Sequence, residues 1–250
     1  MLSRKIIVLK SNSNGFMPYD WHYTIFKQIF NKITLFNKDY ALNLHDEGFR
    51  TKDEKHKKMK LFNFSLQFKD NEMLKEGIKI NEDNTIDLII SGYNEIINAF
   101  LQGLIIDDKF NIDNILFTVK GVKNDKKVYF NKINIYKTIT PVVESVWQEG
   151  IYYLNPYQPE YYNAIKNNLK RKYKLIYNRE YNGELKIQIE NILKAKLKTI
   201  TIKDGYLRGY GKYEMLVQAD KDMQKVVYYC GLGQNNSMGA GFLNYITGGE

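Results

Sequence analysis

Apolar residues in the first half of the chain recur with spacings that predict the order strand, helix, strand, strand, helix, strand. The apolar run at 5–10 is typical of a strand, and apolar residues every three or four positions from 25 to 33 indicate one buried helix face. Asp20 is expected to cap that helix. A shorter helix is predicted at 38–45 and a second amphipathic helix at 93–104. The other strand candidates have a two-residue alternation or a short apolar run: 61–68, 77–80, 85–90 and 115–119.

The second half of the chain repeats this order in outline. A strand pattern at 128–136 precedes a long helix from Glu160 to about Tyr177, and Pro159 is a residue typical of a helix start. A short helix is expected to begin at Asp220. The strand candidates of this half are 185–189, 197–202, 213–218 and 242–246.

Two repeats of this order predict an α+β protein with two tandem ferredoxin-like (RRM-like) domains. The charged stretch 123–127 lies between the two halves and is the best linker candidate. We therefore expect an N-terminal domain at 1–124 and a C-terminal domain at 125–250.

The composition is that of a folded protein, and it argues against a membrane span, a disulfide and a Cys/His metal site. With 250 residues, 44% of them hydrophobic, the chain can bury a large core. It lacks the run of about 20 apolar residues that spans a membrane, and the run of four apolar residues before Lys10 is too short for a signal peptide. A single cysteine, Cys230, excludes an internal disulfide, and three scattered histidines form no Cys/His cluster. We expect a cytoplasmic protein with no membrane contact, no metal and no cofactor.

The charge balance favours an anionic partner. The chain has 37 Lys and Arg against 28 Asp and Glu, a formal net charge of +9. Neutralisation of phosphates supplies most non-specific affinity for nucleic acids, so nucleic acid is the first expectation. A Lys- and Asn-rich genome gives the same balance without such a partner. The stripe Lys166, Lys170 and Lys174 on the long helix is open to both interpretations, because it either tracks RNA or is a solvated helix face.

The most specific local pattern is a glycine-rich loop at 231–241. Gly231, Gly233, Gly239 and Gly241 form a G-x-G-x5-G-x-G pattern just before the last predicted strand. Glycine tolerates a positive φ and the close approach of another backbone, so such a loop can turn its N–H groups toward phosphates. No Lys-Ser or Lys-Thr follows, which excludes a Walker loop. The alternative is a glycine-dense hairpin that only packs against a neighbouring helix.

This loop resembles the C-terminal signature of the CRISPR repeat-processing endoribonucleases of the RAMP superfamily. Further segments resemble the same family in the same order, and together they span nearly the whole chain: 23–33, 44–45, 60–65, 140–143 and 161–173. The resemblance implies two ferredoxin-like domains and metal-independent cleavage of precursor guide RNA. In that reaction a ribose 2′-hydroxyl attacks the adjacent phosphodiester, leaving a 2′,3′-cyclic phosphate and a 5′-hydroxyl. The implied partners are CRISPR repeat RNA and, as a further class, other CRISPR effector subunits, with the chain a monomer or a homodimer.

The resemblance also implies the site residues. His45 falls where the family has a histidine between its first helix and second strand, and Lys60 matches a lysine that stabilises phosphate charge. His45 alone is also typical of a histidine that interacts with a helix C-terminus. Lys52, Lys55, Lys57 and Lys58 are close enough to replace Lys60, or they form a solvated basic loop. The RNA-binding residues expected are Gly231, Gly233, Asn235, Asn236, Ser237, Gly239 and Gly241, with Lys57 and Lys58.

The chain departs from the family pattern in the first helix. Some members have a tyrosine where this chain has Phe30, whose ring carries no proton to exchange. Tyr40 is a candidate replacement. Of the other histidines, His22 is expected to cap or pack at a helix start, and His56 stands exposed among lysines.

Three functional hypotheses follow. The first is a metal-independent endoribonuclease that uses His45 for proton transfer and Lys60 for charge stabilisation. The second is a non-catalytic relative that holds repeat RNA in an effector complex, which Phe30 favours. The third is an unrelated basic scaffold without salt-dependent RNA affinity.

Overall fold

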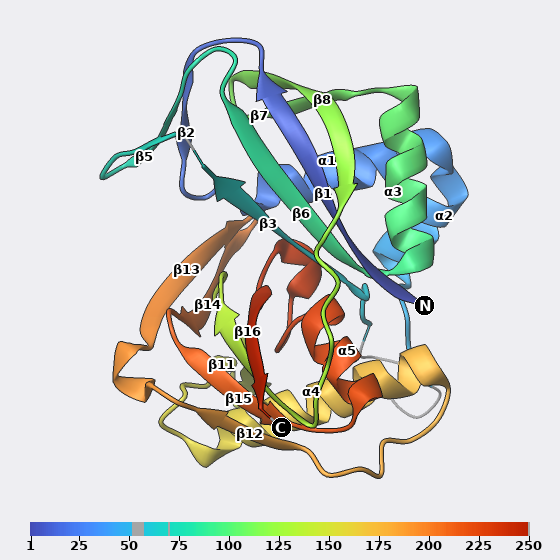
Figure 1. Ribbon diagram of the computed structural model, residues 1–250, viewed down its shortest axis with the longest axis vertical. Helices are drawn as coiled ribbons and strands as arrows, with labels where there is room; N and C mark the ends of the chain where they lie inside the picture. Colours follow the sequence, from blue (N-terminus) through green and yellow to red (C-terminus); the bar gives the residue numbers. More distant parts are fainter. Residues whose placement is uncertain (52–57, 70, 250) are drawn as a thin grey trace.

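The computed structural model describes residues 1–51, 58–69 and 71–249 and folds them into two ferredoxin-like domains, one above the other in Figure 1. The upper domain in that view contains the first half of the chain and the lower domain the second half. The α-helices of the described residues are α1 (His22–Phe36), α2 (Lys38–Asp46), α3 (Asn94–Ile106), α4 (Pro159–Tyr177) and α5 (Lys221–Cys230).

The N-terminal domain is built on an antiparallel sheet. Its strands are, in spatial order, β3 (Phe62–Phe68), β6 (Thr85–Tyr93), β1 (Leu2–Ser11), β8 (Ile115–Asn124) and β7 (Lys109–Ile112). Without the edge strand β7, four strands remain, and along the chain they come in the order β1, β3, β6 and β8. The first of these, β1, lies between the third and the fourth, β6 and β8, which is the ferredoxin-like arrangement. A small separate sheet contains β2 (Gly15–Pro18), β5 (Gly77–Ile80) and β4 (Glu72–Met73).

The C-terminal domain has the same topology. Its sheet contains, in spatial order, β12 (Lys186–Ile189), β15 (Glu214–Gln218), β9 (Ile133–Thr138) and β16 (Leu243–Gly249). Two hairpins are inserted into it: β10 (Ser145–Trp147) with β11 (Ile151–Tyr153), and β13 (Lys196–Ile202) with β14 (Gly205–Gly211). The tandem ferredoxin-like fold predicted from the element order is confirmed.

Each domain has its own hydrophobic core. Of the apolar positions of α1 that predicted a buried face, Ile25, Ile29 and Ile33 are fully buried against the N-terminal domain core, and Phe26 is partly buried. In the C-terminal domain Ile165 and Leu169 of α4 have the same role. Helical periodicity therefore identified the faces that hold each domain together.

A buried arginine joins the two domains. Arg4 of β1 donates hydrogen bonds to the carbonyl oxygens of Tyr228 (2.5 Å) and Leu243 (3.0 Å). Its guanidinium also lies 3.6 Å from the centre of the Tyr228 ring. Across the same junction, Asn63 of β3 donates to the Ala240 carbonyl oxygen at 2.9 Å, which ties the sheet to the glycine-rich loop. These bonds satisfy polar groups that burial would otherwise leave unpaired.

Two expectations about elements are corrected, and strand β14 was among the strands that were not predicted. Asp20 does not cap α1, because the N-cap residue is Trp21 and no side-chain cap bond is present. The strand expected from 128 begins at Ile133, because the Phe130 ring packs on aromatic rings of α5 and β16 instead of entering the sheet. The strand β14 was missed, because three of its seven residues are glycine, which is depleted in strands.

Candidate functional site

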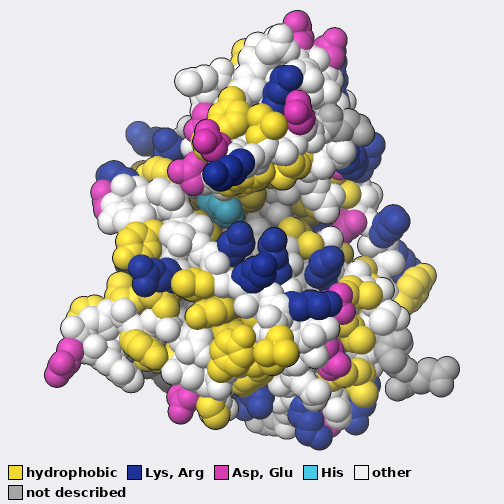
Figure 2. Space-filling view, turned by 90° about the vertical axis from the view of Figure 1, so that its left-hand side faces the viewer, with side chains coloured by type: hydrophobic (Ala, Val, Ile, Leu, Met, Phe, Trp, Pro, Cys, Tyr) yellow, Lys and Arg dark blue, Asp and Glu magenta, His cyan; other side chains and the backbone are white. Residues whose placement is uncertain are grey.

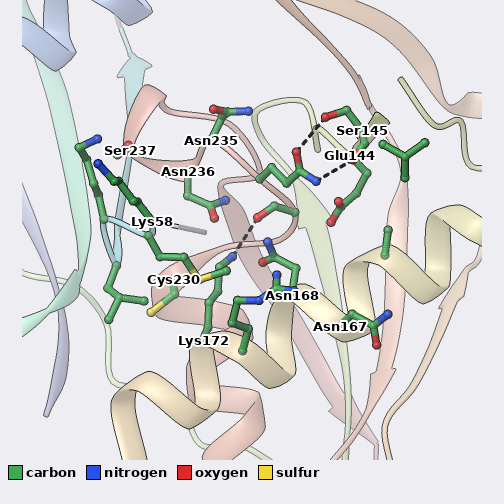
Figure 3. Close-up of a pocket in the computed structure, with 18 of the residues that line it drawn as sticks. Lys58, Glu144, Ser145, Asn167, Asn168, Lys172, Cys230, Asn235, Asn236 and Ser237 are labelled. Atoms are coloured by element: carbon green, nitrogen blue, oxygen red, sulfur yellow. Dashed lines mark hydrogen bonds between the residues drawn. The ribbon is translucent and has the colours of Figure 1, made fainter. Parts of the chain in front are cut away.

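A cavity of about 670 Å³ lies where the two domains meet. It is lined by the segment leading into β3, by α4, by the start of the β10–β11 hairpin and by the glycine-rich loop (Figure 3). Four basic residues contribute to its wall: Lys58, Lys60, Arg171 and Lys172. Figure 2 shows Lys and Arg side chains gathered across one face of the molecule, around a hollow with a His side chain at its edge. Such a concentration of positive charge attracts anions.

Lys172 fixes the glycine-rich loop to α4. Its ammonium donates to the carbonyl oxygens of Gly231 at 2.8 Å and Gly233 at 3.0 Å (Figure 3). The side chain is buried, and this burial lowers the pKa of Lys172 to about 8. Lys172 belongs to the segment 161–173 that resembles the family, as part of a Lys-Tyr pair, but the sequence assigned it no role of its own. The stripe itself does not line the cavity, and Lys174 pairs with Glu180 at 2.5 Å.

The glycine-rich loop is shaped by close backbone contacts. Gly241 has a φ of 68°, and a Cβ there would overlap the Leu232 carbonyl oxygen. Gly233 has a φ of 69° and lies against the Val143 carbonyl oxygen. These two glycines are therefore required by close backbone packing, against Leu232 of the loop itself and against Val143, and not by the neighbouring helix that the sequence alternative named. The loop residues that line the cavity are Gly233, Gln234, Asn235, Asn236 and Ser237.

A carboxylate is buried on the other side of the cavity. Glu144 follows the segment 140–143 and is only 1% exposed, and its Oε1 has no hydrogen-bond partner among the described residues. Burial raises the pKa of Glu144 to about 7, partly offset by the attraction of Lys172 and a hydrogen bond with Gln234. The amide oxygen of Asn168 on α4 is buried and unpaired in the same way. Asn168 belongs to an Asn-Leu pair in the segment 161–173 that resembles the family, but no sequence pattern indicated that Glu144 or Asn168 is buried.

The raised pKa of Glu144 predicts a pH-dependent stability. Between pH 4.5 and about 7 the folded state holds a proton that the unfolded state has released, so stability falls as the pH rises through that window. The full penalty, at most about 3 kcal/mol, applies above it. We expect Glu144→Gln to be more stable than the parent chain by about 1–3 kcal/mol at pH 8, with no difference near pH 4. Urea unfolding at both values checks this, and a variant that is less stable at pH 8 contradicts it.

His45 lies outside the cavity, at the C-terminal end of α2. Its side chain is 56% exposed, and Nδ1 lies 2.8 Å from Asp46 Oδ1. The Phe30 ring meets the imidazole edge-on, with the ring centres 5.5 Å apart. His45 therefore has an orienting carboxylate on one nitrogen and an aromatic neighbour where some relatives of the family have a tyrosine.

The cavity-lining lysines connect His45 to the cavity. Lys58 donates to the Asp46 carbonyl oxygen at 2.5 Å, so the segment entering β3 is attached to the end of α2. Burial lowers the pKa of Lys60, repulsion from Lys58 lowers it further, and the Asp46 carboxylate opposes both. Lys60 lines the cavity and His45 does not, and Asp46 lies next to His45 in the chain and attracts Lys60. Four other residues that the sequence raised lie outside the described part of the chain: Lys52, Lys55, His56 and Lys57.

Tyr40 and His22, two further residues considered from the sequence, do not line the cavity. Burial raises the pKa of Tyr40, and the nearby Glu95 and Tyr93 raise it further. The Tyr40 hydroxyl is buried with no hydrogen-bond partner among the described residues. His22 is buried and stacked on Trp21 with ring centres 3.9 Å apart, and burial lowers its pKa to about 4. Packing at the helix start, as expected, is what His22 does.

The described residues offer neither a metal-binding cluster nor a membrane-spanning helix. No three His, Cys, Asp or Glu side chains in the described ranges are grouped so as to hold a metal ion. None of the described helices has the length and apolar character needed to cross a membrane. Cys230, which lines the cavity, is a free buried thiol.

Comparison with known proteins gives consistent matches along the whole chain. Residues 16–123 match the family described as CRISPR-associated protein Cas6, N-terminal, and residues 123–245 match CRISPR associated protein Cas6, C-terminal. The chain is 32% identical over 241 residues to CRISPR-associated endoribonuclease Cas6 1 of Methanocaldococcus jannaschii, covering 94% of this chain and 89% of that protein. It is 26% identical over 233 residues to CRISPR-associated endoribonuclease Cas6 of Pyrococcus furiosus, covering 91% and 83%.

Solved structures agree in fold. A structure titled CRISPR associated protein Cas6 superposes with a TM-score of 0.80 at 32% identity, covering 99% of this chain and all of the other. A Cas6-related protein from Pyrococcus furiosus superposes with a TM-score of 0.82 at 21% identity, covering 98% and 99%. With two domain-length family matches and a 32% identical relative over nearly its full length, this chain belongs to the Cas6 family of CRISPR-associated proteins.

Proposed function

We propose that this chain is an endoribonuclease that cuts precursor CRISPR RNA within its repeats, using the RNA's own 2′-hydroxyl as the nucleophile and no metal ion. The observation that carries the proposal is the cluster of His45, Asp46, Lys58 and Lys60 at the edge of the basic cavity. The names of the relatives from Methanocaldococcus and Pyrococcus support the same reaction class.

The cluster can supply what the reaction requires. A base must take the 2′ proton, an acid must protonate the leaving 5′ oxygen, and a cation must stabilise the extra charge of the transition state. With Asp46 on Nδ1, the His45 ring is held as the tautomer whose Nε2 is free to exchange a proton. Lys60 is partly desolvated, so its charge acts more strongly on a nearby phosphate than it would in water.

The RNA is proposed to follow the junction between the domains. The band of Lys and Arg side chains on the surface and the formal charge of +9 favour a polyanion there. Within the loop, Gly233, Asn235, Asn236 and Ser237 line the cavity and are the members proposed to contact RNA, together with Lys58. The roles predicted for Lys57 and for Gly231, Gly239 and Gly241 stay predictions.

Several broader expectations belong to the same proposal. The protein acts in the cytoplasm as a monomer or homodimer, and other CRISPR effector subunits are its further partners. We place the domain boundary at 124/125, where the charged stretch follows β8. Salt-dependent RNA binding would separate this proposal from a basic scaffold.

The test is an incubation of the full chain with its own repeat RNA in excess EDTA. We expect one cut per repeat, with 2′,3′-cyclic phosphate and 5′-hydroxyl ends, and the same rate after magnesium is restored. Cleavage that requires the metal, or products with 3′-hydroxyl ends, contradict the proposed chemistry.

Phe30 allows a gain-of-function prediction. Phe30→Tyr adds a hydroxyl to a ring that already touches His45, so we expect the single-turnover cleavage rate to rise about tenfold. Phe26→Tyr is the matched control, because that ring lies one helical turn away with its centre 6.4 Å from the His45 ring, and it should change the rate less. An unchanged rate in both variants would remove the ring at position 30 from the reaction.

A second candidate function rests on the same residue. Without a hydroxyl at Phe30, the chain fits a relative that binds repeat RNA and does not cut it. Tight, salt-dependent binding with intact RNA in the EDTA experiment selects this alternative.

A further inference from the structure

We propose that the cavity beside His45 is a nucleobase pocket that selects guanine, with Glu144 and Asn168 as the hydrogen-bond acceptors. The inference rests on the proposed function, because it names a specificity element of the same RNA site. It begins from two polar atoms that the fold leaves unpaired.

The unpaired atoms are the Oε1 of Glu144 and the Oδ1 of Asn168. Glu144 is 1% and Asn168 6% exposed, and neither atom has a hydrogen-bond partner among the described residues. Figure 3 shows the two side chains entering the same space, Glu144 from the hairpin side and Asn168 from α4. A buried acceptor without a donor costs free energy, so a ligand with donors gains affinity there.

The donors around these atoms are already in use. Lys172 donates to two carbonyl oxygens of the glycine-rich loop. Gln234 donates to the Ser145 carbonyl oxygen and accepts from the Ser145 hydroxyl, each at 2.9 Å. Its hydrogen bond with the Glu144 carboxylate still leaves Oε1 unpaired. Asn236 donates to the carbonyl oxygens of Leu232 and Ala240. The inner wall therefore presents acceptors to a ligand.

A purely structural role for Glu144 is less consistent with these contacts. Lys172 attracts the Glu144 carboxylate electrostatically, but the hydrogen bonds that its ammonium donates in the described part of the chain go to the carbonyl oxygens of Gly231 and Gly233. Burial also raises the pKa of Glu144, which means that the site destabilises its carboxylate. Groups kept at a cost to stability are typical of binding sites.

Two neighbouring acceptors match one base. Guanine has two adjacent donors on its Watson–Crick edge, N1–H and the N2 amino group. Adenine and cytosine each have one amino group beside an acceptor nitrogen, and uracil has one N–H between two carbonyl groups. Only guanine can pair both acceptors without bringing a further acceptor against them.

The rest of the cavity suits a nucleotide. Its volume of about 670 Å³ is within the range of small-molecule pockets, and Lys58 and Lys60 on its wall can contact a flanking phosphate. Trp147, 78% exposed, also lines it and offers a stacking surface for a base. Because Lys58 is bonded to Asp46 beside His45, the selected guanine would lie close to the bond that is cut.

The test is a binding selection from a random 12-nucleotide RNA pool with the full chain carrying His45→Ala, so that cleavage does not distort the result. We expect guanine to be enriched about tenfold at one position of the bound pool. Adding Glu144→Gln should reduce that enrichment below about twofold, since the amide replaces one acceptor oxygen with a donor. Adding Glu149→Gln, which makes the same charge change on an exposed residue of the hairpin turn, should leave the enrichment unchanged.

The outcomes separate this inference from the proposed function. No guanine enrichment, or an enrichment that survives Glu144→Gln, overturns the pocket even if the parent chain cuts repeat RNA. Enrichment that is lost in Glu144→Gln supports the pocket even if the parent chain cuts nothing. A pool that does not bind at all overturns both. Urea unfolding of Glu144→Gln shows whether loss of enrichment comes from loss of fold.

Discussion

Replacing His45 with alanine is expected to slow cleavage of repeat RNA at least about 100-fold and to change RNA affinity less than about twofold. The side chain is 56% exposed, and the hydrogen bond it makes within the described part of the chain is to the neighbouring Asp46, so its removal leaves the core intact. What is lost is the group that can exchange a proton near neutrality. Single-turnover cleavage and filter binding, measured on one preparation, give both values.

The control for this experiment is Asn43→Ala, an exposed change on the same helix. It should leave cleavage unchanged. A His45→Ala protein that cuts as fast as the parent chain would assign proton transfer to another residue. A variant that loses binding together with cleavage would indicate that His45 holds RNA rather than transfers protons.

Gly241→Ala is expected to lower the free energy of unfolding by about 2–4 kcal/mol. The backbone at Gly241 has a φ of 68°, and a Cβ would overlap the Leu232 carbonyl oxygen. That oxygen accepts a hydrogen bond from Asn236 at 2.8 Å, and the Leu232 amide donates to the Gly241 carbonyl oxygen at 3.0 Å. Relief of the overlap therefore breaks the contacts that close the loop over the cavity.

Gly121→Ala is the matched control, because a Cβ at that position in β8 has no atom within 4 Å. Its stability should change by less than about 0.5 kcal/mol. Urea unfolding of both variants compares them. A loss of stability in Gly241→Ala as small as that in Gly121→Ala would mean that the loop tolerates a side chain at position 241. Close packing would then not be the reason for a glycine there.

The helices were predictable because their signal is local. The three- and four-residue spacing of apolar residues located α1, α3 and α4. The strand β14 has no such signal, since its glycines fit only because Gly209 lies against the Val142 carbonyl oxygen of a distant segment. Likewise, Phe130 is apolar enough for a strand, and only the aromatic rings that it meets in three dimensions take it out of the sheet.

The residues of the candidate site also differ in whether a local sequence pattern pointed to them. His45 and Lys60 could be proposed because they follow recognisable segments in a fixed order along the chain. Asn168 and Lys172 lie in a segment that resembles the family, yet no role could be assigned to them or to Glu144, because their burial beside residues distant in the sequence has no local pattern. Positive φ was predictable for the glycine-rich loop, whereas its internal contacts were not, since the carbonyl oxygens that exclude a Cβ come partly from the segment 140–143.

The central claim is that the RNA provides its own nucleophile and the His45 cluster moves the protons. It is tested most directly by a repeat RNA with a single 2′-deoxy nucleotide immediately 5′ of the bond that is cut. We predict that this RNA binds like the unmodified RNA and is not cleaved at that bond. Cleavage of the 2′-deoxy RNA at the normal bond and rate would contradict the mechanism, since another nucleophile would then be at work.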